Sequence, residues 1–141
     1  MAILITGGTG SIGSALTRRL IERGEKDLIL FDIAPRLDRI SDIKDKVKIV
    51  PGDLTVWPEV MNAVKSNDVQ GIFHLGSMLS GACEANPWSG YQTIVTGTMH
   101  VLEAARLFGV KRVFLSSTQG TYGIGIPEVI TDETLQRPIT L

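Results

Sequence analysis

A glycine-rich loop between an apolar run and an amphipathic stretch constrains this chain more than any other feature. Residues 2–5 predict a short buried strand, and residues 15–22 predict a helix with Leu16, Leu20 and Ile21 inward. Between them stands TGGTGSIG, residues 6–13. A glycine pattern predicts a dinucleotide-binding loop when it follows a strand and opens a helix.

Each glycine has a physical task in such a loop. Gly7 permits the tight turn out of the strand, Gly10 leaves the backbone open to a pyrophosphate, and Gly13 lets the helix pack closely. The free N–H groups at the start of that helix then face the phosphates, which places Ser11 and Ile12 in the same site.

One acidic residue supports this prediction. Residues 27–31 predict a second strand, and Asp32 ends it, 19 positions after Gly13. That separation is close to the roughly 20 residues expected for a carboxylate that binds the adenosine ribose. Such a carboxylate repels a 2′-phosphate, so Asp32, with Ile33 beside it, predicts NAD as the cofactor. The alternative is that Asp32 only caps the next turn.

Further strands are predicted at residues 47–50, 71–75 and 111–116, with helices at 56–65 and 86–108. Alternating strands and helices predict an α/β fold, a doubly wound parallel sheet of about five strands with ligands at its carboxyl end. Asp53 and Leu54 follow the third strand, where they are expected to contact the adenine. A turn aspartate is the alternative for Asp53.

The composition excludes several classes of protein. The 141 residues carry 14 basic and 15 acidic side chains without clusters, and no apolar run approaches the length of a membrane span, so neither nucleic acid nor a membrane is an expected partner. The single Cys83 excludes an intramolecular disulfide and fits a cytoplasmic protein. His74, Cys83 and His100 do not have metal-site spacing. His74 is expected to be structural, and His100 receives no role.

Several motifs together resemble the extended short-chain dehydrogenase/reductase superfamily, the NAD-dependent epimerases and dehydratases. They are TGGTGSIG, GDL at 52–54, FHLGS at 73–77, GTMHVLEAA at 97–105 and SSTQGTYG at 116–123. The resemblance implies a Rossmann-type domain over residues 1–141. It also implies that Leu75, Gly76, Ser77 and Ser116 lie along the NAD.

In this superfamily the catalytic hydroxyl lies four residues before the motif tyrosine. Tyr122 is that tyrosine, so the resemblance implies that Thr118 is catalytic, with Ser117 as the alternative, and that Tyr122 packs or touches substrate. Backbone capping is the other interpretation of such a hydroxyl cluster.

The family's catalytic Tyr-x-x-x-Lys does not occur in these residues, because neither Tyr91 nor Tyr122 has a lysine four positions later. We therefore expect the N-terminal, NAD-binding part of a longer enzyme, without its substrate-binding lobe and with one sheet face partly bare. A natural short nucleotide-binding protein is the alternative. An exposed apolar sheet face predicts that the protein associates with a partner, and a homo-oligomer is one possible form of this association.

Residues 77–87 are the best indication of substrate. They resemble a stretch of the short-chain-type L-threonine 3-dehydrogenases, in which a serine corresponding to Ser80 holds the substrate carboxylate. Thr118 instead favours a nucleotide-sugar epimerase or dehydratase, which takes and returns a hydride. The three hypotheses are therefore such an epimerase, an amino-acid dehydrogenase with net NAD reduction, and a non-catalytic NAD-binding module.

Overall fold

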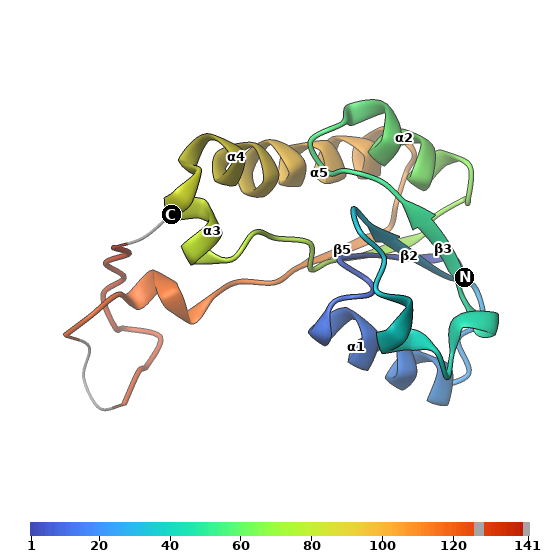
Figure 1. Ribbon diagram of the computed structural model, residues 1–141, viewed down its shortest axis with the longest axis horizontal. Helices are drawn as coiled ribbons and strands as arrows, with labels where there is room; N and C mark the ends of the chain where they lie inside the picture. The colour runs from blue at the N-terminus through green and yellow to red at the C-terminus, as the bar shows by residue number, and fades with distance from the viewer. Residues whose placement is uncertain (126–128, 140–141) are drawn as a thin grey trace.

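The computed structural model describes residues 1–125 and 129–139. Its centre is one sheet of five parallel strands in the order β3-β2-β1-β4-β5 (Figure 1). The strands are β1 Ile3–Thr6, β2 Leu28–Asp32, β3 Lys48–Pro51, β4 Gly71–His74 and β5 Arg112–Leu115. The chain moves outward from β1 in both directions, so the predicted doubly wound α/β fold is confirmed.

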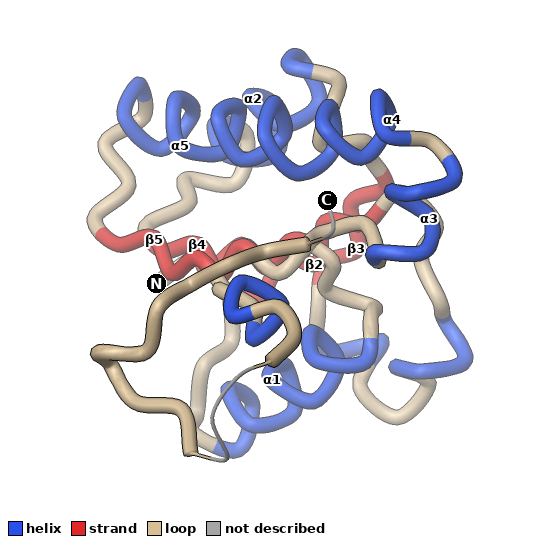
Figure 2. Tube along the Cα trace, turned by 90° about the vertical axis from the view of Figure 1, so that its left-hand side faces the viewer, coloured by secondary structure: helices blue, strands red, loops and turns tan. Residues whose placement is uncertain are grey.

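Helices cover both faces of the sheet (Figure 2). Helix α1, Ser11–Glu22, lies on one face, and α2, Trp57–Lys65, lies with α5, Gly97–Leu107, on the other. Each strand therefore needs apolar side chains on both sides, and β1 and the first four residues of β2 are fully buried.

Two separate apolar clusters result from this layering. On the α2 and α5 face, Leu4, Phe31 and Ile72 pack with Val60 and Val101. On the α1 face, buried Ile3, Ile5, Leu28 and Leu30 pack with Ile40 and Ile43 of the connection after β2, and the partly buried Leu16, Leu20 and Ile21 cover them as predicted.

Element boundaries differ from the prediction in places. Helix α1 begins at Ser11, four residues early, because Gly10 in extended conformation already caps it. The predicted helix over 86–108 consists of α4, Pro87–Tyr91, a π-helical segment, Gln92–Thr96, and α5. Its start is as predicted, since Asn86 Oδ1 accepts a hydrogen bond from Ser89 N at 3.1 Å. A further short helix, α3 Ser80–Ala85, was not predicted.

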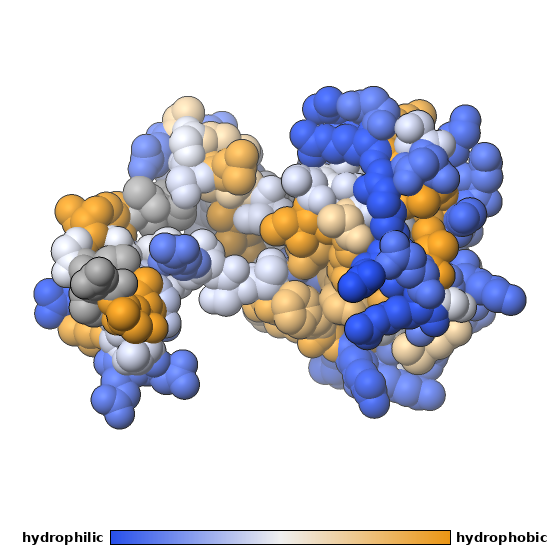
Figure 3. Space-filling model, turned by 90° about the horizontal axis from the view of Figure 1, so that it is seen from below, coloured by the Kyte–Doolittle hydropathy of each residue, from blue (hydrophilic) through white to orange (hydrophobic). Residues whose placement is uncertain are grey.

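The α1 face is incompletely covered near β5. Phe114 is 53% exposed, and it borders a hollow of about 800 Å³ that Phe73 and Leu20 also line. Seen from this side, hydrophobic side chains gather in the middle of the molecule (Figure 3). The expected partly bare sheet face is thus present in the described residues. None of the helices in those residues is long and apolar enough to cross a membrane.

Candidate functional site

The glycine loop lies at the carboxyl end of β1, in close contact with the end of β4. Gly7 has φ +63°, a conformation that favours glycine, and a Cβ there would lie 3.0 Å from Gly76 Cα. A Cβ on Gly76 would in turn lie 2.8 Å from Leu54 Cδ1. The two loops therefore approach each other as closely as backbones allow.

The first turn of α1 continues directly from this loop. Its first intrahelical hydrogen bond runs from Ser14 N to Gly10 O at 2.9 Å, so the amides of Ser11, Ile12 and Gly13 precede the helical ladder. A Cβ on Gly13 would overlap the carbonyl oxygen of Gly7. The first turn contains no acidic residue. Its N–H groups and its dipole thus favour an anion at this position.

Asp32 contacts both the glycine loop and its own turn. Its Oδ2 accepts hydrogen bonds from Thr9 N at 3.1 Å and from Thr9 Oγ1 at 2.6 Å. Its Oδ1 accepts a longer one from Ala34 N at 3.3 Å. The turn-capping contact of the alternative interpretation is therefore present, yet the half-exposed carboxylate also lies at the edge of a cavity.

This cavity, about 240 Å³, is where most of the predicted cofactor residues meet. Eight of them line it: Gly7, Gly10, Asp32, Ile33, Leu54, Leu75, Gly76 and Ser77. They come from the ends of four different strands and are brought together only by the parallel sheet. The composition of the site, a glycine loop, one carboxylate and apolar side chains from facing walls, suits a nucleotide.

Phe31 and Thr93 also line the cavity and were not predicted. Phe31 is the strand residue before Asp32, so its position next to a predicted site residue was the available signal. Thr93 had no comparable signal, because it lies in the π-helical segment. A π turn takes up one more residue than an α turn and changes which side chains face the sheet.

Asp53 and Leu54 separate in the structure. Asp53 Oδ1 accepts from Thr55 N at 2.8 Å, and Asp53 N donates to Glu59 Oε2 at 2.7 Å, which are turn contacts. Leu54 is buried and lines the cavity. His100, for which no role was predicted, donates from Nδ1 to the carbonyl oxygen of Leu54 at 2.8 Å. An adenine contact of Asp53 stays a prediction.

The hydroxyl cluster after β5 lies outside the cavity lining. Ser116 N donates to His74 O at 3.3 Å, which keeps Ser116 beside the end of β4. Ser117 and Thr118 are exposed. Thr118 Oγ1 accepts from Gly120 N at 3.1 Å and so caps the short 3-10 turn that ends at Tyr122. The capping interpretation thus has direct support, while the catalytic role of these residues stays a prediction.

Ser80 is the first residue of α3 and is exposed. It does not line the cavity around the glycine loop. Its expected contact with a substrate carboxylate is therefore a prediction that the described contacts neither support nor oppose.

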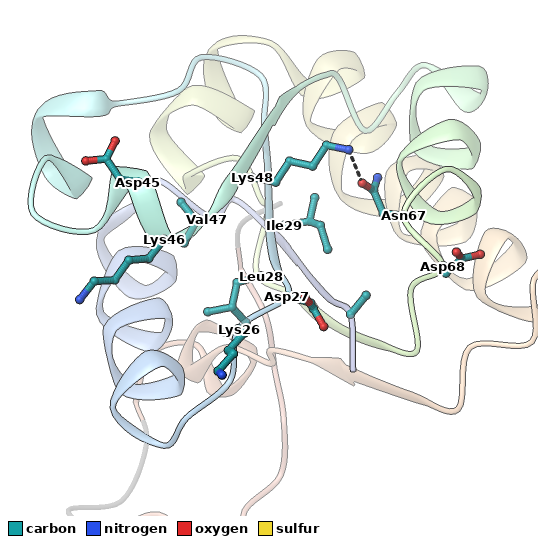
Figure 4. Close-up of a pocket in the computed structure, with 11 residues that line it drawn as sticks. Lys26, Asp27, Leu28, Ile29, Asp45, Lys46, Val47, Lys48, Asn67 and Asp68 are labelled. Carbon is teal, nitrogen blue, oxygen red and sulfur yellow. Dashed lines mark hydrogen bonds between the residues drawn. The ribbon is translucent and has the colours of Figure 1, made fainter.

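A larger hollow, about 570 Å³, lies at the amino end of the sheet, away from every predicted site residue (Figure 4). Lys26, Lys46 and Asp45 on its rim are exposed, and Lys48 Nζ donates to Asn67 Oδ1 at 2.7 Å. Although this hollow is larger than the cavity beside the glycine loop, chemistry favours the smaller cavity, because ligands of doubly wound sheets bind at the carboxyl ends of the strands.

Known proteins resemble the chain over nearly its whole length. The sequence profile of the NAD dependent epimerase/dehydratase family matches residues 3–140. A UDP-glucose 4-epimerase of Streptococcus mutans is 34% identical over 99% of this chain, and a D-erythronate dehydrogenase of Cupriavidus necator is 32% identical over 98%. The solved L-threonine dehydrogenase of Clostridium difficile superposes with a TM-score of 0.85 at 31% identity over 99% of this chain. The chain spans 42%, 45% and 43% of these three proteins, respectively.

Proposed function

Since this chain belongs to the NAD dependent epimerase/dehydratase family, we propose that its carboxyl-edge cavity binds NAD. We further propose that the chain is the NAD-binding part of a nucleotide-sugar epimerase-like enzyme. The observation that carries the proposal is the convergence of eight residues, selected from sequence patterns, on one cavity beside the glycine loop.

The residues around the cavity fit a dinucleotide. Side chains larger than hydrogen do not fit at Gly7 and Gly13, so the backbone is open to a diphosphate there. The first-turn amides at Ser11 and Ile12 are positioned to hold that diphosphate. Asp32 keeps acceptor capacity beyond its contacts with Thr9 and Ala34, since each carboxylate oxygen has two lone pairs.

The sign of the charge at Asp32 supports NAD over NADP. A carboxylate accepts hydrogen bonds from ribose hydroxyls and repels a phosphate on the 2′ oxygen. Arg36 lies nearby, and its guanidinium is paired with Asp38 at 3.0 Å, not with Asp32.

NAD, when bound, supplies a hydride acceptor that an epimerase uses transiently. Among this chain's own residues, Thr118 is proposed to hydrogen-bond the substrate oxygen that loses its proton. Ser117 is the alternative. Tyr122 is proposed to contact the substrate. The cap contact is compatible with such a role, because Thr118 Oγ1 only accepts from Gly120 N and keeps its own hydrogen and a second lone pair for another partner.

Calorimetric titration of the purified protein with NAD and NADP tests the proposal. We expect saturable NAD binding that is at least about 10-fold tighter than NADP binding, the difference expected from one unfavourable charge contact. The absence of NAD binding at millimolar concentration would contradict the proposal.

A dehydrogenase with net NAD reduction is the second candidate. It is favoured by the similar identities of the D-erythronate and L-threonine dehydrogenases and by Ser80 at the start of α3. Its substrate would be a small hydroxy acid or amino acid. NADH absorbance that accumulates with NAD and threonine or a hydroxy acid would favour this candidate, because an epimerase produces no net NADH.

We also propose that two copies associate through the outer face of α4 and α5. Exposed apolar side chains recur there every three or four residues, namely Trp88, Tyr91, Val95, Met99 and Leu102. Such spacing is typical of a helix that packs against a partner helix. Trp88 and Tyr91 stack on each other with ring centroids 5.7 Å apart and so form one continuous apolar surface on this face.

A further inference from the structure

His74 is the last residue of β4 and is only 3% exposed. It lies between two threonine hydroxyls, one on the sheet and one on a helix. His74 Nδ1 is 2.7 Å from Thr6 Oγ1, and Nε2 is 3.0 Å from Thr98 Oγ1. The function proposed above assigns no task to this buried imidazole.

The hydrogen-bond partners leave only one arrangement of protons. Thr98 Oγ1 donates its single hydrogen to Ile94 O at 2.5 Å, so His74 Nε2 must be the donor to Thr98. Thr6 Oγ1 accepts from Leu75 N at 3.1 Å and from Gly76 N at 3.0 Å, so its own hydrogen is free for His74 Nδ1. The hydroxyl hydrogens of Thr6 and Thr98 and both ring nitrogens of His74 then each have a partner.

One end of this chain of bonds lies in the cavity lining, and the other ends one residue away from it. At one end, Leu75 and Gly76 form the wall against which Gly7 packs. At the other, Ile94 belongs to the π-helical segment and follows Thr93, which lines the cavity from the helical side. The imidazole is therefore the link between a wall at the end of the sheet and a wall in the helical layer that packs against it.

We propose that His74, as a neutral imidazole with its proton on Nε2, is a positioning residue that holds the Leu75–Gly76 wall and the Thr93 segment at the spacing that NAD requires. The inference rests on the proposed binding of NAD in this cavity. His74 does not touch the cofactor in this role and acts through Thr6 and Thr98.

The environment of His74 agrees with a neutral ring. Burial lowers the pKa of His74 to about 4, so the imidazole is uncharged near neutral pH. A second proton on Nδ1 would displace the hydrogen of Thr6 Oγ1, which already accepts two amide hydrogens. The network therefore requires one proton on the ring.

The nitrogen chemical shifts of His74 test the tautomer without any cofactor. In long-range ¹H–¹⁵N spectra at neutral pH, we expect a protonated Nε2 and an unprotonated Nδ1. The opposite tautomer, an even mixture of the two, or an imidazolium would overturn the inference even if NAD binds.

Thr98→Val tests the coupling, because it removes the acceptor for His74 Nε2 with little change of shape. We expect it to weaken NAD binding by about 3- to 10-fold, as the loss of one buried hydrogen bond in the positioning network would. It should also shift the amide resonances of Gly7 and Gly76 in the free protein. Thr96→Val is the matched control in the same helical stretch and should change neither quantity.

The outcomes separate the two proposals. If the unaltered protein does not bind NAD, the proposed function fails. The link between the walls is then judged in the free protein, where unchanged amide resonances of Gly7 and Gly76 in Thr98→Val would overturn it. If the unaltered protein binds NAD and Thr98→Val binds it equally well, His74 has no positioning role and the proposed function stands. A His74→Asn and Thr98→Val double variant should weaken binding no more than the stronger single variant, because both interrupt one network.

Discussion

At the scale of single residues, Asp32 makes the turn contact of one interpretation and also has the position at the cavity that the other interpretation requires. Its carboxylate accepts hydrogen bonds from Thr9 in the glycine loop and from Ala34 in its own turn, and it also borders the cavity. A capping contact therefore does not argue against a ligand contact, since a carboxylate has about four acceptor sites.

Asp32→Asn is expected to weaken NAD binding by about 10- to 100-fold, because charge-assisted hydrogen bonds contribute about 1.5–3 kcal/mol. NADP binding should fall less, since the repulsion of its phosphate is removed as well. Calorimetry with both cofactors measures this. Asp45→Asn, the same charge change at the amino end of the sheet, is the control, and Thr9→Val separates the loop contact of Asp32 from its ligand contact. Equal losses in Asp32→Asn and Asp45→Asn would contradict the assignment.

At the scale of elements, the β1–loop–α1 unit is determined by close backbone approach. Helix α1 can begin at Ser11 because Gly13 brings its first turn against Gly7 and Gly8 without a side chain between them. The same lack of side chains would leave the backbone open to the proposed diphosphate, so packing and the proposed binding depend on the same residues.

Gly13→Ala is expected to lower the free energy of unfolding by about 1–3 kcal/mol, because its Cβ would overlap backbone atoms that cannot move aside. Urea unfolding at neutral pH measures the loss. Gly81→Ala in α3, where an added Cβ meets nothing within 4 Å, is the matched control and should be neutral or stabilising by up to about 1 kcal/mol. A similar effect of the two substitutions would show that the close approach is not a constraint.

The outer face of α4 and α5 is the second element with a testable consequence. Met99 is 58% exposed in the middle of the apolar stripe, so Met99→Glu should shift the protein toward the monomer by placing a charge in the contact. Light scattering after size-exclusion chromatography measures the mass. Asn62→Glu on the exposed side of α2 should leave the mass unchanged. Association that persists in Met99→Glu would instead point to the open sheet face around Phe114.

At the scale of the whole molecule, the hydrogen-bond network of His74 joins the sheet to α5. Thr6 belongs to β1, His74 to β4 and Thr98 to α5, so the network spans two strands and one covering helix. The network exists only in the folded chain, so protonation of His74 should change the free energy of unfolding of the whole protein.

Burial lowers the pKa of His74 to about 4, against about 6.5 when the residue is exposed. Between these two pH values the unfolded chain binds more protons than the folded chain. The contribution of neutral His74 to the free energy of unfolding should therefore be fully present above pH 6.5 and should decrease as the pH falls toward 4. The loss from this group is on the order of 3 kcal/mol. Urea unfolding at pH 7 and pH 4.5 measures it. His74→Asn should lose much less over the same window, and an equal loss would show that other groups are responsible.

Sequence patterns by themselves determined the order of the elements and the parallel sheet, and with the family resemblance they predicted most of the cavity lining. These features depend on local chemistry: buried apolar runs, glycines at a tight turn and a carboxylate at a strand end. In a doubly wound sheet such strand ends must meet at one edge, so Gly7, Asp32, Leu54 and Gly76 were predictable as neighbours without knowledge of their contacts.

Only the tertiary structure decided which polar side chains face the cavity and which close turns. Asp53 and Thr118 both follow strands, but the side chain of each accepts a hydrogen bond from a backbone amide two residues later. Thr93 enters the lining through a π-helical turn, and His74 and His100 obtain partners from residues distant in sequence. Local patterns do not contain such contacts, because they depend on how separately formed layers pack together.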